Sequence, residues 1–225
     1  MDENRELLDC VEIEPPGPCD ASVLWLHGLG ADGHDFPPIV PELGLPPEHG
    51  VRFVFPHAPV RAVTINAGMR MRAWYDIVDL DSDDRGDEAG VRDSAEHVAA
   101  LVARETERGV RVGRIVLAGF SQGGAVALHL GLRHPERLAG ILALSTYIAC
   151  DCDLDAERHP ANHATPIFQA HGTLDPMVPH HRGVAARDRL RGLGYAVEWH
   201  EYPMAHQVCL EEIQAVGTWL RGRLG

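Results

Sequence analysis

The sequence of 225 residues predicts an α/β fold with a mostly parallel, doubly wound sheet. Short, uninterrupted apolar segments recur along the chain, a pattern typical of strands that are buried on both faces. Longer segments with apolar residues at helical spacing lie between several of them. Strands that alternate with helices form parallel sheets, whose ligands bind at the carboxyl ends of the strands. The sequence therefore also predicts where a functional site belongs.

Seven segments have strand patterns, and the first of them is the least regular. Strands are expected at residues 8–13, 23–26, 51–55, 115–118, 140–144, 166–170 and 196–199. Four segments have the apolar spacing of amphipathic helices, at residues 88–108, 122–133, 181–193 and 207–220. In the first of these, Val91, Ala95, Val98 and Val102 share one helix face. The chain shows no internal repeat or low-complexity segment.

Length and composition indicate one domain, residues 1–225, with a single sizeable core. There is little room for an added cap domain. The net charge of −13 and the pI near 5.4 argue against nucleic acids and anionic membrane surfaces as electrostatic partners, because both would repel the chain.

The N-terminal residues contain no basic segment followed by an apolar one, and no run in the chain is long enough to cross a bilayer. We therefore expect a cytoplasmic protein that is not integral to a membrane. The number of cysteines is odd and they are scattered, so reduced thiols are expected at Cys10, Cys19, Cys150, Cys152 and Cys209.

The expected strand at 115–118 leads into Gly119-Phe120-Ser121-Gln122-Gly123, and a helix pattern follows. G-x-S-x-G between a strand and a helix is typical of a nucleophile elbow, a turn too tight for side chains at its glycines. It presents the serine hydroxyl at a helix N-terminus. Ser121 is therefore the candidate nucleophile. The alternative is a glycine-rich packing turn with an incidental serine.

Two further residues follow later strands, where partners of Ser121 are expected. Asp175 lies in a turn just beyond the strand at 166–170, and His206 lies in the loop before the last helix. The order Ser, Asp, His is that of the α/β-hydrolases. Asp151, Asp153 and Asp155 are the alternative acids, whereas the other histidines beyond Asp175 fall at a helix start or in a strand: His180, His181 and His200.

The residue types match the chemistry of acyl transfer. A serine hydroxyl is a weak nucleophile, so a histidine must accept its proton while a carboxylate holds the imidazole in the right tautomer. The backbone N–H of Gln122, the residue after the nucleophile, is the first candidate donor to the oxyanion. Leu29, between Gly28 and Gly30, is the second. A phosphate-binding loop is the alternative reading of this glycine-rich segment, but its spacing does not match.

Five segments, in order, resemble the carboxylesterase / acyl-protein thioesterase / lysophospholipase family, in its bacterial carboxylesterase branch. They are His27-Gly28-Leu29-Gly30-Ala31, Met69-Arg70-Met71-Arg72-Ala73-Trp74-Tyr75-Asp76, Gly119-Phe120-Ser121-Gln122-Gly123-Gly124, Gly172-Thr173-Leu174-Asp175-Pro176-Met177-Val178-Pro179 and Tyr202-Pro203-Met204-Ala205-His206. The resemblance extends from about Val23 to the C-terminus.

This resemblance implies a minimal α/β-hydrolase without a cap, with Ser121, Asp175 and His206 as triad, Leu29 and Gln122 as oxyanion donors, and no metal or organic cofactor. The implied reaction is hydrolysis of small-molecule or lipid-like acyl esters, and of thioesters, by a monomer or homodimer. An acyl channel would involve Trp74, Ile77, Leu80, Tyr147, Ile148, Met177 and Val178. Other readings are a long-chain acyl-protein thioesterase or lysophospholipase, and a catalytically silent binding module.

Two segments carry further hypotheses. Residues 145–152 depart from the leucine-proline turn that relatives usually have, and Cys150-x-Cys152 is too closely spaced for a typical zinc site, so we expect a surface loop with two free thiols. The nearby His159 and His163 are the other candidate ligands. The acidic residues between positions 76 and 88 do not match a calcium-binding loop and are expected to be solvated.

Overall fold

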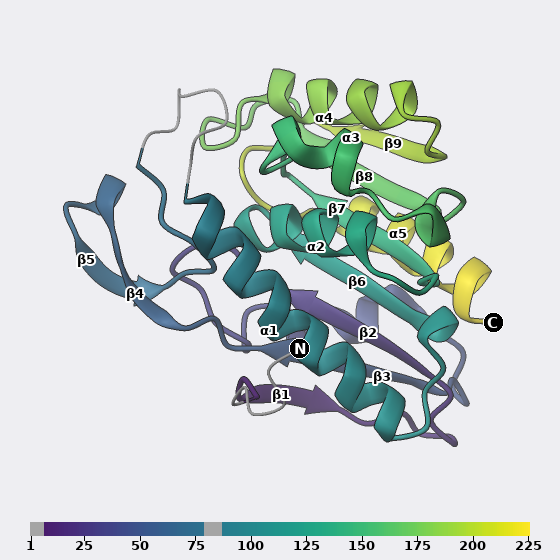
Figure 1. The fold of residues 1–225 in the computed structure, drawn as a ribbon. Helices are drawn as coiled ribbons and strands as arrows, with labels where there is room; N and C mark the ends of the chain where they lie inside the picture. Colours follow the sequence, from purple (N-terminus) through teal and green to yellow (C-terminus); the bar gives the residue numbers. More distant parts are fainter. Residues whose placement is uncertain (1–6, 79–86) are drawn as a thin grey trace.

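The computed structural model describes residues 7–78 and 87–225, which contain a seven-stranded central sheet (Figure 1). The strands lie in the order β1-β3-β2-β6-β7-β8-β9; β1 runs antiparallel to β3, and every other neighbouring pair is parallel. Their bounds are β1 (Cys10–Ile13), β2 (Ala21–Leu26), β3 (Val51–Pro56), β6 (Ile115–Phe120), β7 (Gly140–Leu144), β8 (Ile167–Gly172) and β9 (Val197–Tyr202).

Helices cover both faces of the sheet. One face packs against α1 (Glu88–Glu107), α2 (Gln122–Arg133), α3 (Leu154–Glu157) and α4 (His180–Gly192). The other packs against α5 (Leu210–Leu224) and the 3₁₀ helix η1 (Pro37–Leu43). The remaining 3₁₀ turns are η2 (Thr64–Asn66), η3 (Val112–Arg114), η4 (Asp151–Asp153) and η5 (Pro160–Asn162). This is the α/β architecture that the alternating sequence pattern predicts.

Successive side chains of a strand point to opposite faces of the sheet, and both faces of the central strands are buried, which explains why these strands are apolar throughout. In β2, Leu24 and Leu26 belong to the core on the α1–α2 side, whereas Val23 and Trp25 belong to the core on the α5 side. Each side chain is at most 1% exposed, so both faces of the strand are buried. The parallel sheet therefore brings the carboxyl ends of β2, β6, β8 and β9 to one edge.

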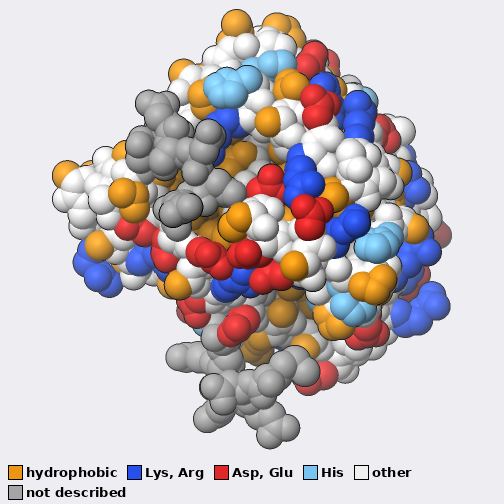
Figure 2. Space-filling view, turned by 45° about the horizontal axis from the view of Figure 1, so that its top comes forward, with side chains coloured by type: hydrophobic (Ala, Val, Ile, Leu, Met, Phe, Trp, Pro, Cys, Tyr) orange, Lys and Arg blue, Asp and Glu red, His pale blue; other side chains and the backbone are white. Residues whose placement is uncertain are grey.

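The structure confirms all seven predicted strands and all four predicted helices, with some shifted ends. The last helix starts at Leu210, later than predicted, because Cys209 adopts an extended conformation as its N-cap. A hairpin of β4 (Val60–Val63) and β5 (Met69–Arg72) was not predicted, because arginines break up its apolar pattern. It projects at the left of Figures 1 and 2 and exposes hydrophobic side chains, among them Val60 and Met69.

No helix in the described parts of the chain, 7–78 and 87–225, has both the length and the apolar character needed to cross a bilayer.

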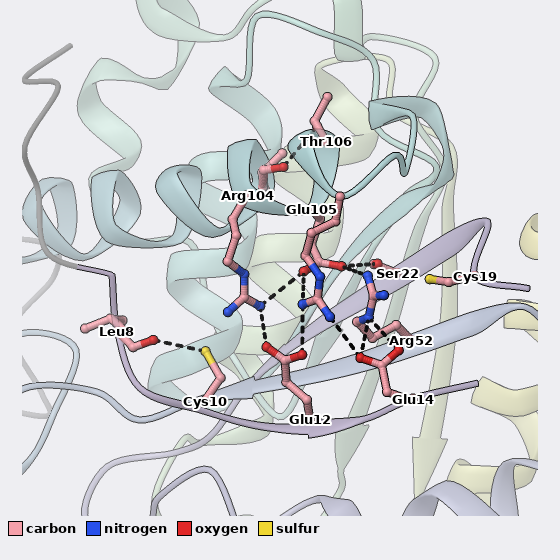
Figure 3. Close-up of polar contacts among 12 residues, drawn as sticks. Leu8, Cys10, Glu12, Glu14, Cys19, Ser22, Arg52, Arg104, Glu105 and Thr106 are labelled. Atoms are coloured by element: carbon pink, nitrogen blue, oxygen red, sulfur yellow. Dashed lines mark hydrogen bonds and ion pairs between the residues drawn. The ribbon is translucent and has the colours of Figure 1, made fainter. Parts of the chain in front are cut away.

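A buried carboxylate on α1 ties this helix to the edge of the sheet (Figure 3). Glu105 is fully buried, and its Oε2 accepts hydrogen bonds from Ser22 Oγ at 2.6 Å and Arg52 Nη1 at 2.8 Å. Its Oε1 accepts from Arg104 and Arg108 at 3.1 and 3.0 Å. All 20 basic residues of the chain are arginines, whose planar guanidinium suits such forked contacts.

The same arginines extend the network to β1 and the residue that follows it. Arg108 donates to Glu12 and Glu14, each at 2.8 Å, and Arg52 Nε donates to Glu14 at 3.0 Å. Burial alone would raise the pKa of Glu105, but the hydrogen bonds from Ser22 and Arg52 and the nearby arginine charges lower it overall. The carboxylate is therefore ionised and joins β1, β2, β3 and α1.

We predict that Glu105→Ala destabilises the protein by about 3–5 kcal/mol, because the largely buried Arg52 loses its buried carboxylate partner and keeps only the exposed Glu14. Since the folded-state pKa of Glu105 is lowered, its contribution is present above the unfolded-state pKa and is lost as the pH falls through the folded value. Urea unfolding of both proteins across the acid range would measure this. Glu107→Ala, an exposed glutamate on the same helix, should change little. Equal stability of wild type and Glu105→Ala at neutral pH would contradict the role of the network.

Candidate active site

The turn between β6 and α2 has the geometry of a nucleophile elbow. Ser121 has φ +53° and ψ −122°, a conformation that residues other than glycine rarely adopt. A Cβ atom on Gly119 would lie 2.3 Å from the carbonyl oxygen of Gly123, and one on Gly123 would lie 2.5 Å from that of His27. Side chains are thus excluded at both glycines, as the sequence predicts. The Ser121 backbone is held by its N–H bond to Leu144 O at 2.8 Å.

Three side chains from different loops meet at this turn. His206 Nε2 lies 2.9 Å from Ser121 Oγ, and His206 Nδ1 lies 2.7 Å from Asp175 Oδ2. Since a carboxylate accepts but does not donate, Nδ1 carries the proton, and the lone pair on Nε2 faces the serine hydroxyl. The His206 ring also packs against Phe120, with ring centroids 4.7 Å apart. This arrangement can move a proton from serine to imidazole.

Asp175 is held rigidly in the turn after β8. Its side chain is fully buried, and its Oδ1 accepts the backbone N–H groups of Met177 and Val178 at 2.8 and 2.9 Å. These bonds are typical of an aspartate that orders its own turn. They leave Oδ2 directed at His206. His206 is less enclosed, with a side chain 18% exposed.

The loop after β2 is oriented by a buried histidine. His27 Nε2 accepts the Ala58 N–H at 3.1 Å, so the ring proton lies on Nδ1, which donates to Gly28 O at 2.7 Å. Burial lowers the pKa of His27 to about 4 and keeps it neutral at physiological pH. Because the peptide is trans, the Leu29 N–H points opposite to the Gly28 carbonyl, away from His27. Sequence reasoning did not assign His27 any role.

Gln122 contributes two different groups. Its backbone N–H is the first of α2, and N–H groups in a first turn have no intrahelical acceptor. Its buried side chain accepts from Trp74 N–H at 2.7 Å and donates to Tyr75 O at 2.7 Å. The side chain therefore fastens the loop after β5 to the start of α2. Sequence reasoning identified only the backbone group.

A cavity of about 450 Å³ opens beside Ser121. Apolar side chains form most of its wall, which suits an acyl group. It is lined by Gly28, Leu29, Gly30, Ala31, Asp35, Asn66, Met71, Ile77, Phe120, Ser121, Gln122, Tyr147, Met177, Val178, Arg182 and His206.

Comparison with known proteins identifies the family of this chain. Residues 8–223 match the phospholipase/carboxylesterase family. The chain belongs to this family. Acyl-protein thioesterase 1 of Neurospora crassa is 41% identical over 214 residues, which cover 91% of this chain and 87% of the relative.

Solved structures of family relatives share the fold, which is that of the α/β-hydrolases. Arabidopsis thaliana SOBER1 superposes with a TM-score of 0.86 at 31% identity, covering 92% of this chain and 100% of that one. Zea mays acyl-protein thioesterase 2 superposes with a TM-score of 0.86 at 29% identity, covering 96% and 99% of the two chains.

Not every residue expected in the acyl channel lies on the cavity wall. Ile77, Tyr147, Met177 and Val178 do. Trp74 does not, because its side chain is completely buried beneath the loop after β2, where its Nε1–H donates to His27 O at 2.8 Å.

Ile148 does not line the cavity either, because it packs against the core between α2, α3 and α4. Leu80 lies outside the described residues, as do several residues of the predicted acidic loop.

Other wall residues gave little signal in the sequence. Phe120 sits inside the elbow motif itself, so its place beside His206 follows from the turn. Met71 and Asn66 come from the unpredicted hairpin and its connecting turn, and Arg182 comes from α4. Since single polar or flexible side chains have no periodic pattern, only the fold brings them to the cavity.

The alternative acids are engaged elsewhere. Arg189 on α4 pairs with Asp151 at 2.8 Å and with Asp155 at 2.6 Å. Asp153 pairs with Arg92 on α1 at 3.2 Å. These contacts tie the segment after β7 to the helices.

The two cysteines of residues 145–152 differ from the expectation of two surface thiols. Cys152 is exposed, but Cys150 is 6% exposed and packs into the core beside α1 and α2. The expectation of a surface thiol was therefore wrong for Cys150, whose side chain is buried by its packing against this core.

Within the described residues, only Asp32, His34 and His57 have ligand atoms close enough together, within 4.8 Å, to hold a metal ion. Asp32 and His57 already accept hydrogen bonds from the backbone of the loop after β2. Asp32 Oδ1 accepts the His34 backbone N–H at 2.7 Å, and His57 Nδ1 accepts the Gly33 N–H at 3.0 Å. A metal ion would have to compete with the Gly33 bond.

We predict that Gly119→Ala damages the elbow, because its Cβ would lie 2.3 Å from a backbone oxygen that cannot move alone. The expected cost is about 1–3 kcal/mol or more of stability, together with reduced turnover of an ester substrate. Gly192→Ala, at the end of α4 with open space around its Cβ, should stay within about 1 kcal/mol of wild type. Thermal unfolding and steady-state kinetics measure both effects. A Gly119→Ala protein with wild-type stability and kcat would show that the elbow tolerates a side chain.

Proposed function

We propose that this chain is a serine hydrolase that cleaves carboxylic esters, and thioesters, of acyl groups through an acyl-Ser121 intermediate. The observation that carries the proposal is the position of His206, within 2.9 Å of Ser121 Oγ and 2.7 Å of Asp175 Oδ2. Membership of the phospholipase/carboxylesterase family supports the ester bond as the target.

In the proposed first step, His206 Nε2 takes the Ser121 proton while Oγ attacks the acyl carbonyl carbon. Asp175 keeps Nδ1 protonated and stabilises the imidazolium that forms. When the tetrahedral intermediate collapses, His206 returns the proton to the departing alcohol or thiol. Water then attacks the carbonyl carbon of the acyl-Ser121 intermediate while His206 takes its proton. His206 returns this proton to Ser121 Oγ as the acid is released.

The proposed oxyanion donors are the backbone N–H groups of Leu29 and Gln122. The Gln122 group lies at the N-terminus of α2, whose dipole also favours negative charge there. The Leu29 group points away from His27 and belongs to a residue on the cavity wall. These steps use only protein groups and water, so the proposal includes no metal and no organic cofactor.

The cavity wall supports an acyl substrate. Ile77, Tyr147, Met177 and Val178 are the proposed acyl contacts, and Met71 and Phe120 join them from the structure. Acyl-protein thioesterase 1 of Neurospora crassa and the maize acyl-protein thioesterase 2 favour a thioester as a second substrate class. A long-chain thioesterase or lysophospholipase is the alternative within the same chemistry.

Ser121→Ala tests the proposal directly. Because it removes the attacking oxygen and keeps the backbone, turnover of an ester should fall by at least about a thousandfold while the protein remains folded. Initial rates on p-nitrophenyl esters of increasing acyl length, an acyl thioester and a lysophospholipid would measure the loss and rank the substrates. A folded variant that keeps more than a few per cent of activity would exclude Ser121. Wild-type protein inactive on every substrate would favour a silent binding module.

Leu29 allows a test of the second oxyanion donor. Leu29→Pro removes the N–H and should cost about 2.7–4 kcal/mol of barrier, roughly 10²–10³ in kcat. Leu29→Ala keeps the N–H and should change mainly KM, through lost contact with the acyl group. Circular dichroism and a crystal structure of the proline variant control for distortion of the loop. A folded Leu29→Pro enzyme with wild-type kcat would place the donor elsewhere.

A further inference from the structure

We propose that His171 is a positioning residue for the acid of the site: its Nε2–H fixes the turn 175–178 and thereby sets how Asp175 meets His206. The inference rests on the proposed function, since it assigns a task within the same proton relay. His171 does not line the cavity and makes no hydrogen bond to the serine, and neither its sequence position nor the family match assigns it a role.

The contacts form a closed path around Asp175. His171 Nε2 lies 2.9 Å from the carbonyl oxygen of Val178 and 3.7 Å from Asp175 Oδ2. The Val178 N–H, in turn, donates to Asp175 Oδ1 at 2.9 Å. Val178, at the end of the turn, is therefore bonded twice: its carbonyl accepts from His171 and its N–H donates to Asp175. Oδ2 is left to His206 at 2.7 Å.

The protonation state of His171 follows from these partners. A carbonyl oxygen only accepts, so the proton lies on Nε2. Burial lowers the pKa of His171, and the charges of His180 and His206 act in the same direction, whereas the Val178 carbonyl and Asp175 raise it. The ring is therefore neutral when the enzyme works. A charged ring at 3.7 Å would compete with His206 for the carboxylate.

The orientation of the ring is fixed from two sides. His171 is 1% exposed, and α4 passes so close that a Cβ on Gly183 would lie 2.3 Å from His171 Nδ1. Trp199 of β9 stacks on the ring with centroids 6.3 Å apart. His180, on α4, meets it edge-on at 5.9 Å and is itself paired with Glu201 of β9 at 2.8 Å. The Nε2–H therefore has one direction available.

Removing this donor should affect the chemical step. The Val178 carbonyl would lose its donor in a buried turn, and Asp175 would be free to shift relative to His206. A misplaced carboxylate stabilises the imidazolium less, so kcat should fall and the imidazole should lose its proton at lower pH. A structural residue without this role would leave the pH profile where it is.

Three variants test the proposal. His171→Met keeps the bulk and removes the donor, whereas His171→Gln carries a neutral N–H at a similar reach. His129→Met is the matched control, because His129 is another buried histidine, 4% exposed, outside the site. For each, kcat, KM and the pH dependence of kcat/KM on one p-nitrophenyl ester are measured, with thermal unfolding as the check on folding. Ser121→Ala is assayed alongside.

We expect His171→Met to lower kcat by about tenfold to a hundredfold, to change KM little, and to move the acid limb of kcat/KM to lower pH. His171→Gln should restore both, and His129→Met should match wild type in both. A folded His171→Met enzyme with an unmoved or upward-shifted acid limb, or a His171→Gln enzyme as impaired as His171→Met, would overturn the proposal. If Ser121→Ala retains activity, the proposed function is wrong. The Ser121→Ala result thus distinguishes failure of the proposed function from failure of the proposal for His171.

Discussion

Helix α2 begins so close to β2 and β6 that neither Gly119 nor Gly123 has room for a side chain, and the rest of the site depends on this contact. A Cβ on Gly123 would lie 2.5 Å from the backbone oxygens of Leu26 and His27, where β2 ends. The approach therefore sets Ser121, the first N–H of α2 and the loop after β2 in one place. A parallel sheet makes this possible because its carboxyl ends share one edge.

Buried histidines then orient the backbone around that edge. His27 donates to the Gly28 carbonyl and His171 to the Val178 carbonyl, and burial lowers the pKa of both. A neutral imidazole can fix a carbonyl without adding a charge beside the site. His206 differs because it is partly exposed and has a carboxylate partner, which suits the proton transfer proposed for it. Their surroundings thus suit His27 and His171 to fixing a backbone carbonyl, and His206 to the proposed role of base.

Sequence reasoning was most successful where a pattern has a single physical cause. Buried strands and amphipathic helices follow from apolar spacing, and the elbow follows from two glycines around a serine. The β4–β5 hairpin was missed because its strands are only four residues long and lack the uninterrupted apolar run that identifies strands buried on both faces. Trp74 was assigned to the acyl channel by its position under the family resemblance, yet it is buried beneath the loop after β2 and supports that loop. His27 and His171 could not be assigned roles, since only the fold shows which carbonyl each reaches.

The central claim is that Ser121 carries the acyl group during turnover, and mass spectrometry of the acid-quenched enzyme measures this directly. Wild-type protein mixed with a p-nitrophenyl ester and quenched within its first turnovers should gain the mass of one acyl group. Peptide mapping should then place that group on Ser121. The ester is one whose p-nitrophenol is released in a burst, because a burst means that acylation is faster than release of the acid. An acyl group on another residue would contradict the account. So would the absence of any acylated protein during that burst.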